Sequence, residues 1–101
     1  MATEYANYID GEWVESATGA TFAVTNPASV DEIVSYHPAS TSADVEDAID
    51  AAVAAQHEWA HTPGPSRGAV LRETGELLAA RKGEATETLV REEGKTRSEA
   101  A

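Results

Sequence analysis

The sequence predicts an α/β fold in which strands come first and helices follow. In the first third of the chain, apolar residues alternate with polar ones, which is the period of a half-buried strand. From Thr41 onward the apolar period changes to about 3.6 residues, which is the period of an amphipathic helix. Asp-Gly, Asn-Pro and Pro-Gly steps separate the segments, as turn residues do between regular elements.

Strands are expected between about residues 8 and 37. Tyr8-Ile9 and Glu12-Trp13-Val14 flank Asp10-Gly11, a pair that adopts the positive φ angles of a type I′ turn. This segment is therefore predicted to form a hairpin.

Two longer strands are expected after a turn cluster at residues 16–19. Phe22 and Val24 alternate with small or polar neighbours, as on the buried face of a half-buried strand. Asn26-Pro27 ends this strand, because proline restricts the residue before it and has no backbone N–H to donate. Residues 32–37 are predicted to form the next strand, which the following proline closes.

Helices are expected in four segments, at about residues 42–60, 65–82 and 84–93 and from about residue 97. Thr41 and Asp44 have the spacing of a capping box, and residues 96–99 repeat it. Gly83 is expected to cap the second helix in the left-handed conformation, and Gly94 to end the third.

The helical segment that begins near residue 97 is about one turn long in this sequence. One isolated turn is not stable in water, because the conformational entropy lost on forming it exceeds the stabilisation from its hydrogen bond. We therefore expect residues 1–101 to be an incomplete, truncated N-terminal segment. Isolated hairpins are also marginal in water, so we expect at most partial order in the chain by itself.

The composition narrows the possible functions. The chain has 18 acidic and 7 basic residues and a net charge of −11, which disfavours nucleic-acid binding through the phosphate backbone. It has no cysteine, and therefore no disulfide, thiolate nucleophile or cysteine-ligated zinc. Neither a signal peptide nor a run of roughly 18 apolar residues is visible, so we expect a soluble, cytoplasmic protein with no membrane partner.

The most direct catalytic motif is His57-Glu58-Trp59-Ala60-His61, which fits the H-E-x-x-H pattern of zinc peptidases. That pattern places two imidazole ligands on one helix face, beside a glutamate that acts as general base. The surroundings argue against this function, because the histidines flank the apolar stripe and no third ligand is evident. We expect them to face solvent; a small zinc-binding protein or metallopeptidase stays open as an alternative.

The ordered set of elements resembles the N-terminal segment of the aldehyde dehydrogenase superfamily over about residues 8–101. That segment combines a hairpin, an Asn-Pro step, an alanine-rich helix that ends near a tryptophan, an arginine-initiated helix and a closing Glu-Gly-Lys. The corresponding residues here are Tyr8–Trp13, Asn26-Pro27, Asp44–Trp59, Arg67–Leu78 and Glu93-Gly94-Lys95. Residues 62–68 and 91–101 are most similar to haloarchaeal members that act on semialdehydes such as 2,5-dioxopentanoate (α-ketoglutarate semialdehyde).

The resemblance implies that residues 1–101 begin a Rossmann-type NAD(P)-binding domain. The full-length enzyme would oxidise a small-molecule aldehyde or semialdehyde to a carboxylate with NAD or NADP, and would form a homo-oligomer. The resemblance to haloarchaeal members also favours the interpretation of the acidic surface as a halophilic adaptation. In the family, the catalytic cysteine, asparagine and base and the cofactor-phosphate loop lie beyond the position that matches Ala101.

We therefore assign no catalytic, cofactor-binding or metal-binding residue within the chain, and expect the 101 residues to be inactive alone. A second alternative is an acidic helical module that binds a partner through the stripe of Leu71, Leu77 and Leu78.

Overall fold

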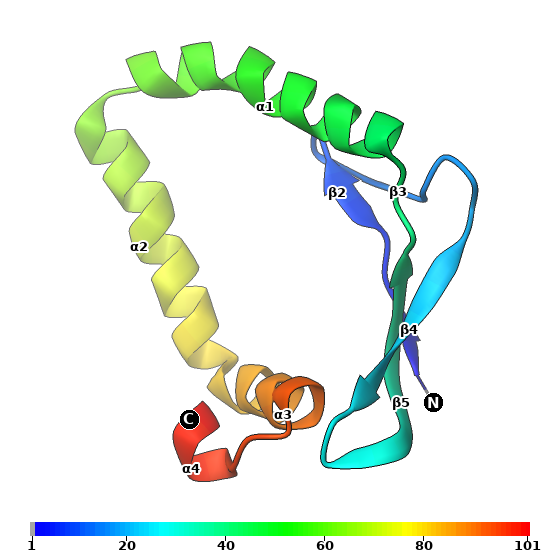
Figure 1. The fold of residues 1–101 in the computed structure, drawn as a ribbon. Coiled ribbons are helices and arrows are strands. Elements are labelled where there is room, and N and C mark those ends of the chain that lie inside the picture. The colour runs from blue at the N-terminus through cyan, green and yellow to red at the C-terminus, as the bar shows by residue number, and fades with distance from the viewer. Residues whose placement is uncertain (1) are drawn as a thin grey trace.

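The computed structural model describes residues 2–101, in which five strands precede four helices (Figure 1). The strands are β1 (Thr3–Glu4), β2 (Asn7–Ile9), β3 (Glu12–Val14), β4 (Thr21–Asn26) and β5 (Ser29–Pro38). The helices are α1 (Ser42–His61), α2 (Gly64–Ala80), α3 (Lys82–Glu93) and α4 (Arg97–Ala100). The predicted α/β class and the order of strands before helices are confirmed.

The predicted hairpin is formed by β2 and β3, which pair antiparallel with Ile9 opposite Glu12. Asp10 and Gly11 connect the strands with φ angles of 51° and 79°, so both central residues of the turn are left-handed. Two positive φ angles are the property of a type I′ turn, as the sequence predicts. The rings of Tyr8 and Trp13 face each other across the hairpin, with centroids 4.9 Å apart.

A second sheet has the strand order β1-β5-β4. β4 and β5 pair antiparallel through a two-residue connection, since Asn26 is opposite Ser29. β5 therefore begins at Ser29, three residues earlier than the sequence predicts, because the tight turn brings the first residues into register. β1 runs parallel to β5 and was not predicted, because two residues carry no periodicity. Phe22 is 52% exposed, so the expected half-buried face of β4 is only partly covered.

The start of α1 is held by a network around Asp44. Its carboxylate accepts hydrogen bonds from the Thr41 amide at 2.7 Å and from the Thr41 hydroxyl at 3.0 Å. It also accepts from the Ala17 amide at 3.0 Å, which ties the loop before β4 to the helix. The predicted capping box is present, and these hydrogen bonds, with those of Thr41 foremost, lower the pKa of Asp44.

The junction of α2 and α3 differs from the sequence prediction. Gly83 lies inside α3 and does not have a positive φ angle, so it is not the left-handed cap of α2. Arg81 joins the helices instead, with φ −101° and ψ 19°. Its amide donates to the Leu77 carbonyl and its own carbonyl accepts from Ala85, so the helical hydrogen bonding continues through a bend and no cap is required.

The elements follow one another around the border of an open frame, with α1 and α2 on two sides and the sheet on another (Figure 1). Val34 is the only buried hydrophobic residue among residues 2–101. The radius of gyration is 16.9 Å, against about 13 Å for a compact domain of 100 residues. The accessible surface is 7620 Å², against about 5,500 Å² for a compact protein of this mass. Residues 2–101 thus form secondary structure without a hydrophobic core of their own.

Replacement of the cap, Thr41→Ala, is expected to destabilise the first turn of α1 by about 1 kcal/mol, because the Asp44 amide loses its side-chain acceptor. The helix content of the chain, measured by circular dichroism at 222 nm, should fall. Ser42→Ala, one residue further into the helix, is the matched control and should leave the signal nearly unchanged. An equal loss of helix content in the two variants would show that the Thr41 side chain does not cap α1.

Asp44→Asn tests the pH dependence of the same network. The folded-state pKa of Asp44 is lowered. Its contribution to stability is therefore complete at pH values above the ordinary aspartate pKa of about 4, and is lost as the pH falls through the lowered pKa. We expect lower helix content in the variant at pH 7 and no difference from the wild type at strongly acidic pH. A difference that persists unchanged in acid would show that the carboxylate charge is not responsible.

Candidate functional site

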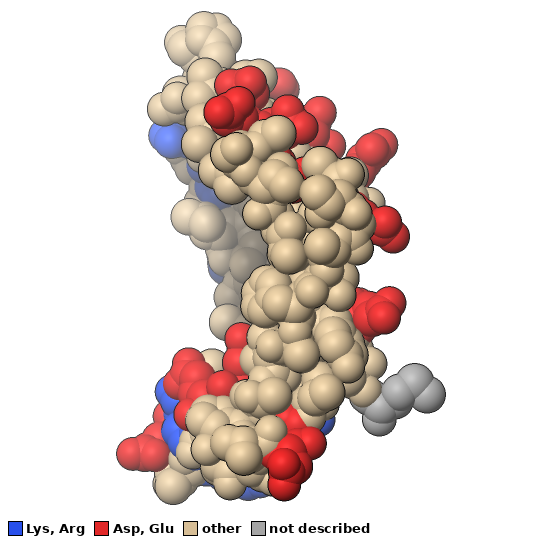
Figure 2. All heavy atoms as spheres, turned by 45° about the vertical axis from the view of Figure 1, so that its right-hand side comes forward, with Lys and Arg blue, Asp and Glu red and all other residues tan. Residues whose placement is uncertain are grey.

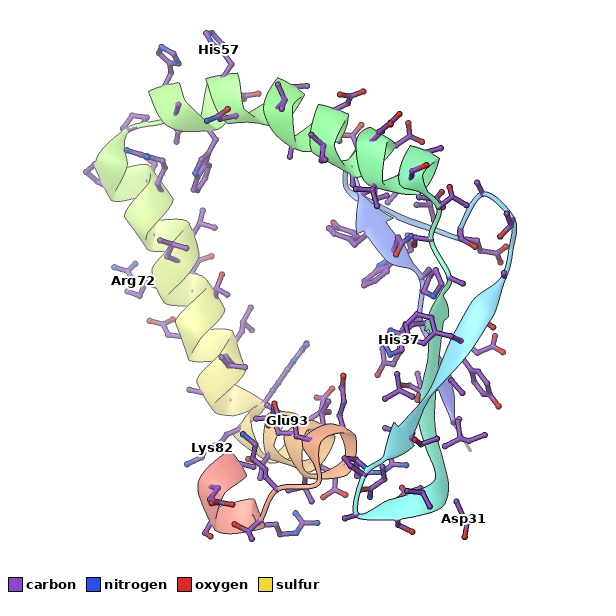
Figure 3. The ribbon with its side chains drawn as sticks, in the orientation of Figure 1. Asp31, His37, His57, Arg72, Lys82 and Glu93 are labelled. Carbon is purple, nitrogen blue, oxygen red and sulfur yellow. The ribbon has the colours of Figure 1, made fainter. Side chains whose placement is uncertain are left out.

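The histidine motif lies on the last turns of α1. His57, Glu58 and His61 are all exposed, and His57 points away from the frame (Figure 3). The two imidazole centroids are 4.6 Å apart. No group of three or more potential metal ligands occurs among residues 2–101, whereas a catalytic zinc site takes three protein ligands and an open position. The structure does not favour the metallopeptidase alternative.

The connection from β5 to α1 is the one strand-to-helix connection in the described chain, and it does not fit a cofactor phosphate. Residues 39–41 contain no glycine, while a phosphate loop needs close approach of the backbone to the ligand. The Asp44 carboxylate already accepts from the amide of the N-cap residue Thr41, and its negative charge opposes a second anion there. We find no site for NAD or NADP among these residues.

The candidate functional surface is an apolar face shared by α1 and α2. Arg72 points outward from the frame, and the apolar residues of α2 lie on the opposite side of the helix by the 3.6-residue period (Figure 3). The side chains of this face are between 44% and 67% exposed. They are Val45, Ile49 and Trp59 of α1 and Val70, Leu71, Leu77 and Leu78 of α2.

A groove continues this face toward the β2–β3 hairpin. It is lined by Tyr8 and Ile9 from β2 and by Val45, Ala48 and Ile49 from α1. Beyond the other end of α1, Nε of Arg67 in the first turn of α2 is buried without a hydrogen bond within residues 2–101. A buried donor without an acceptor is costly. Seven exposed large apolar side chains on α1 and α2 make these sides of the helices the candidate contact surface.

A polar junction fixes α3 against the turn between β4 and β5. Oε1 of Glu32 accepts from Nε of Arg91 at 2.7 Å, and Oε2 accepts from Nδ2 of Asn26 at 2.8 Å. These bonds, that from Asn26 foremost, lower the pKa of Glu32. Gly94 lies over the same turn with φ 70°, and a Cβ atom there would be 3.1 Å from Cγ of Pro27.

The chain belongs to the aldehyde dehydrogenase family, whose model matches residues 13–101. It is 58% identical over 101 residues to the alpha-ketoglutarate semialdehyde dehydrogenase of Haloferax volcanii, covering 100% of this chain and 21% of that protein. It is 43% identical over 96 residues to the alpha-ketoglutaric semialdehyde dehydrogenase of Bacillus subtilis, covering 95% of this chain and 20% of the relative.

Solved structures agree with this assignment. The lactaldehyde dehydrogenase of Escherichia coli superposes with a TM-score of 0.92 and 33% identity, over 99% of this chain and 21% of that one. The 1-pyrroline-5-carboxylate dehydrogenase of Thermus thermophilus, as an R100A mutant, also gives 0.92, with 34% identity over 98% of this chain and 19% of that one. The chain therefore spans about a fifth of the length of its relatives.

Gly94→Ala is expected to loosen the junction of α3 with the β4–β5 turn. A left-handed residue with a Cβ costs about 1–2 kcal/mol, and the contact with Pro27 adds to that. The variant can be measured in a chimaera in which residues 1–101 replace the matching first fifth of the Haloferax volcanii relative. Its thermal unfolding midpoint should fall.

Gly83→Ala, within α3, is the control, since an added Cβ at Gly83 meets nothing within 4 Å and the φ angle there is not positive. Its midpoint should stay the same or rise, because alanine is the better helix former. Equal losses in the two glycine variants would contradict the difference between these positions.

Proposed function

We propose that residues 1–101 are the N-terminal segment of an NAD(P)-dependent dehydrogenase that oxidises a semialdehyde of an oxo-acid to the carboxylate. The observation that carries the proposal is the unfilled apolar face of α1 and α2, in a chain that aligns over its whole length with a fifth of a dehydrogenase. The 58% identity with the Haloferax volcanii relative supports 2,5-dioxopentanoate (α-ketoglutarate semialdehyde) as the substrate.

Within such an enzyme the segment has a structural role. α1 and α2 would cover the sheet of an NAD(P)-binding domain, to which the preceding strands also belong. Burial of a leucine or valine side chain contributes about 1.5–3 kcal/mol, so the exposed stripe gives a large driving force for this packing. A group of the remaining chain would accept the hydrogen bond from Nε of Arg67.

The chemistry would lie outside this segment. In the family a cysteine thiolate attacks the aldehyde, hydride passes to the nicotinamide, and water hydrolyses the resulting thioester. The chain has no cysteine, and the single strand-to-helix connection among residues 2–101 does not fit a cofactor phosphate. We infer that the 101 residues have no oxidoreductase activity alone, and that NAD or NADP binds only in the full-length, homo-oligomeric enzyme.

The charge distribution is consistent with an enzyme that works in concentrated salt. Residues 1–66 contain eleven acidic residues and no lysine or arginine. Residues 67–101 contain seven acidic and seven basic residues. Figure 2 shows acidic side chains scattered over one face, with basic ones at its lower end and left margin. Self-repulsion among uncompensated carboxylates is screened by salt, so we propose that the acidic first part is adapted to high ionic strength in the cytoplasm. Among residues 2–101, no helix combines the length and the hydropathy that crossing a bilayer requires.

The proposal makes one prediction for the activity of the chain alone and one for the chimaera. The purified 101-residue chain should not reduce NAD⁺ or NADP⁺ with 2,5-dioxopentanoate, followed at 340 nm. The chimaera with the remaining four fifths of the Haloferax volcanii relative should turn over that substrate at a rate comparable to the relative itself. Turnover by the chain alone, or a folded but inactive chimaera, would contradict the proposal.

Leu77→Asp in the chimaera tests the apolar face, because a charge there cannot be buried without a partner. We expect loss of the folded, active enzyme. Arg72→Asp introduces the same side chain on the outward side of α2 and should leave most of the activity. Similar activity in the two variants would show that the face is not buried.

A further inference from the structure

His57 and His61 form a pair that the proposed dehydrogenase function does not use. They lie one helical turn apart on α1, both are exposed, and their ring centroids are 4.6 Å apart. In Figure 3 the ring of His57 projects away from the helix, on the side opposite the interior of the frame. Packing of the apolar face against further protein would therefore leave this side of α1 accessible.

A hydrogen bond sets the tautomer of one ring. Nδ1 of His61 is 2.7 Å from the main-chain oxygen of His57. A carbonyl oxygen can only accept, so Nδ1 carries the hydrogen and the neutral ring has its lone pair on Nε2. Metal-binding histidines use the same arrangement, in which one ring nitrogen donates to a carbonyl or carboxylate while the other binds the ion. In this tautomer the lone pair on Nε2 of His61 is available to bind an ion.

The charge around the pair also favours a cation. Glu58 lies within the motif, and residues 1–66 carry no lysine or arginine that would repel a metal ion. Distant carboxylates are screened by salt, so the adjacent Glu58 is the acidic residue that can attract a cation to the pair. Neither property makes the pair a peptidase, because no third protein ligand is present in the described part of the chain.

We propose that His57 and His61 form a two-imidazole surface chelate for a divalent transition-metal ion, with water completing the coordination. Imidazole nitrogen favours Cu²⁺ most strongly and then Ni²⁺ or Zn²⁺, whereas Mg²⁺ and Ca²⁺ prefer oxygen ligands. Two ligands make an open, exchangeable site. This proposal differs from the expectation, based on the sequence, that the chain holds no metal ligand. The difference rests on the hydrogen bond from His61 to His57, which cannot be predicted from the sequence.

Titration of the 101-residue chain with CuCl₂ and NiCl₂ in a non-coordinating buffer, followed by calorimetry, tests the chelate. His57→Gln and His61→Gln should each weaken binding roughly tenfold or more, because a second ligand held at the right distance acts at high effective concentration. His37→Gln, on β5, is the control and should bind like the wild type. MgCl₂ should show no binding that depends on either histidine.

A second variant separates a helical chelate from two independent imidazoles. Gln56→His combined with His57→Ala keeps the number of histidines but places the first ring five residues before His61. The two rings are then about 140° apart around the helix and do not face each other. We expect the same loss as in the single variants, and a metal-induced rise in helix content only in the wild type. Wild-type affinity in this variant, or in either glutamine variant, would overturn the proposal. A wild-type chain that binds neither Cu²⁺ nor Ni²⁺ would overturn it as well.

Discussion

The exposed apolar face of α1 and α2 is the constraint on which the account of this chain depends. The cap of α1, the turn of the hairpin and the strand pairs are all in place, yet only Val34 is a buried hydrophobic residue among residues 2–101. Local hydrogen bonds contribute little net free energy, and burial of apolar surface is the main term that stabilises a fold. The exposed apolar face therefore supports the proposal that further protein supplies the contacts that stabilise these elements.

The polar contacts show how the parts are held in place without a core. Asp44 joins the loop before β4 to α1, and the Glu32–Arg91 pair joins β5 to α3. Both carboxylates have lowered pKa values because hydrogen bonds favour their charged forms. These contacts are partly exposed and individually weak, so they set the relative position of the elements more than they stabilise them.

Local features of the fold could be predicted from the sequence, and long-range ones could not. Asp10-Gly11, the capping residues Thr41 and Asp44, and Gly94 act through neighbours within a few positions, so their types indicate their conformations. Glu32 and Arg91 are 59 positions apart, and no periodicity links them. Gly83 was assigned wrongly, because a glycine after two basic residues is typical of a helix end, whereas here the helix bends at Arg81 and continues.

The histidine motif illustrates the same limit for function. Its spacing alone suggests a zinc peptidase, whereas the proposed dehydrogenase function gives α1 a packing role and does not use the two exposed histidines. The dehydrogenase relation itself was visible in the order of the hairpin, the Asn-Pro step and the helices, because these are local patterns in a fixed sequence. The catalytic residues could not be assigned from this chain, since their proposed positions lie outside it.

Amide hydrogen exchange tests the central claim most directly. It compares α1 and α2 in the isolated chain with the same helices in the chimaera that contains the rest of the Haloferax volcanii relative. If the apolar face is buried by the remaining protein, the amides of both helices exchange orders of magnitude more slowly in the chimaera, because exchange then requires global or subglobal opening. Equal protection in the two proteins would contradict the claim and show that the 101 residues stabilise their own fold.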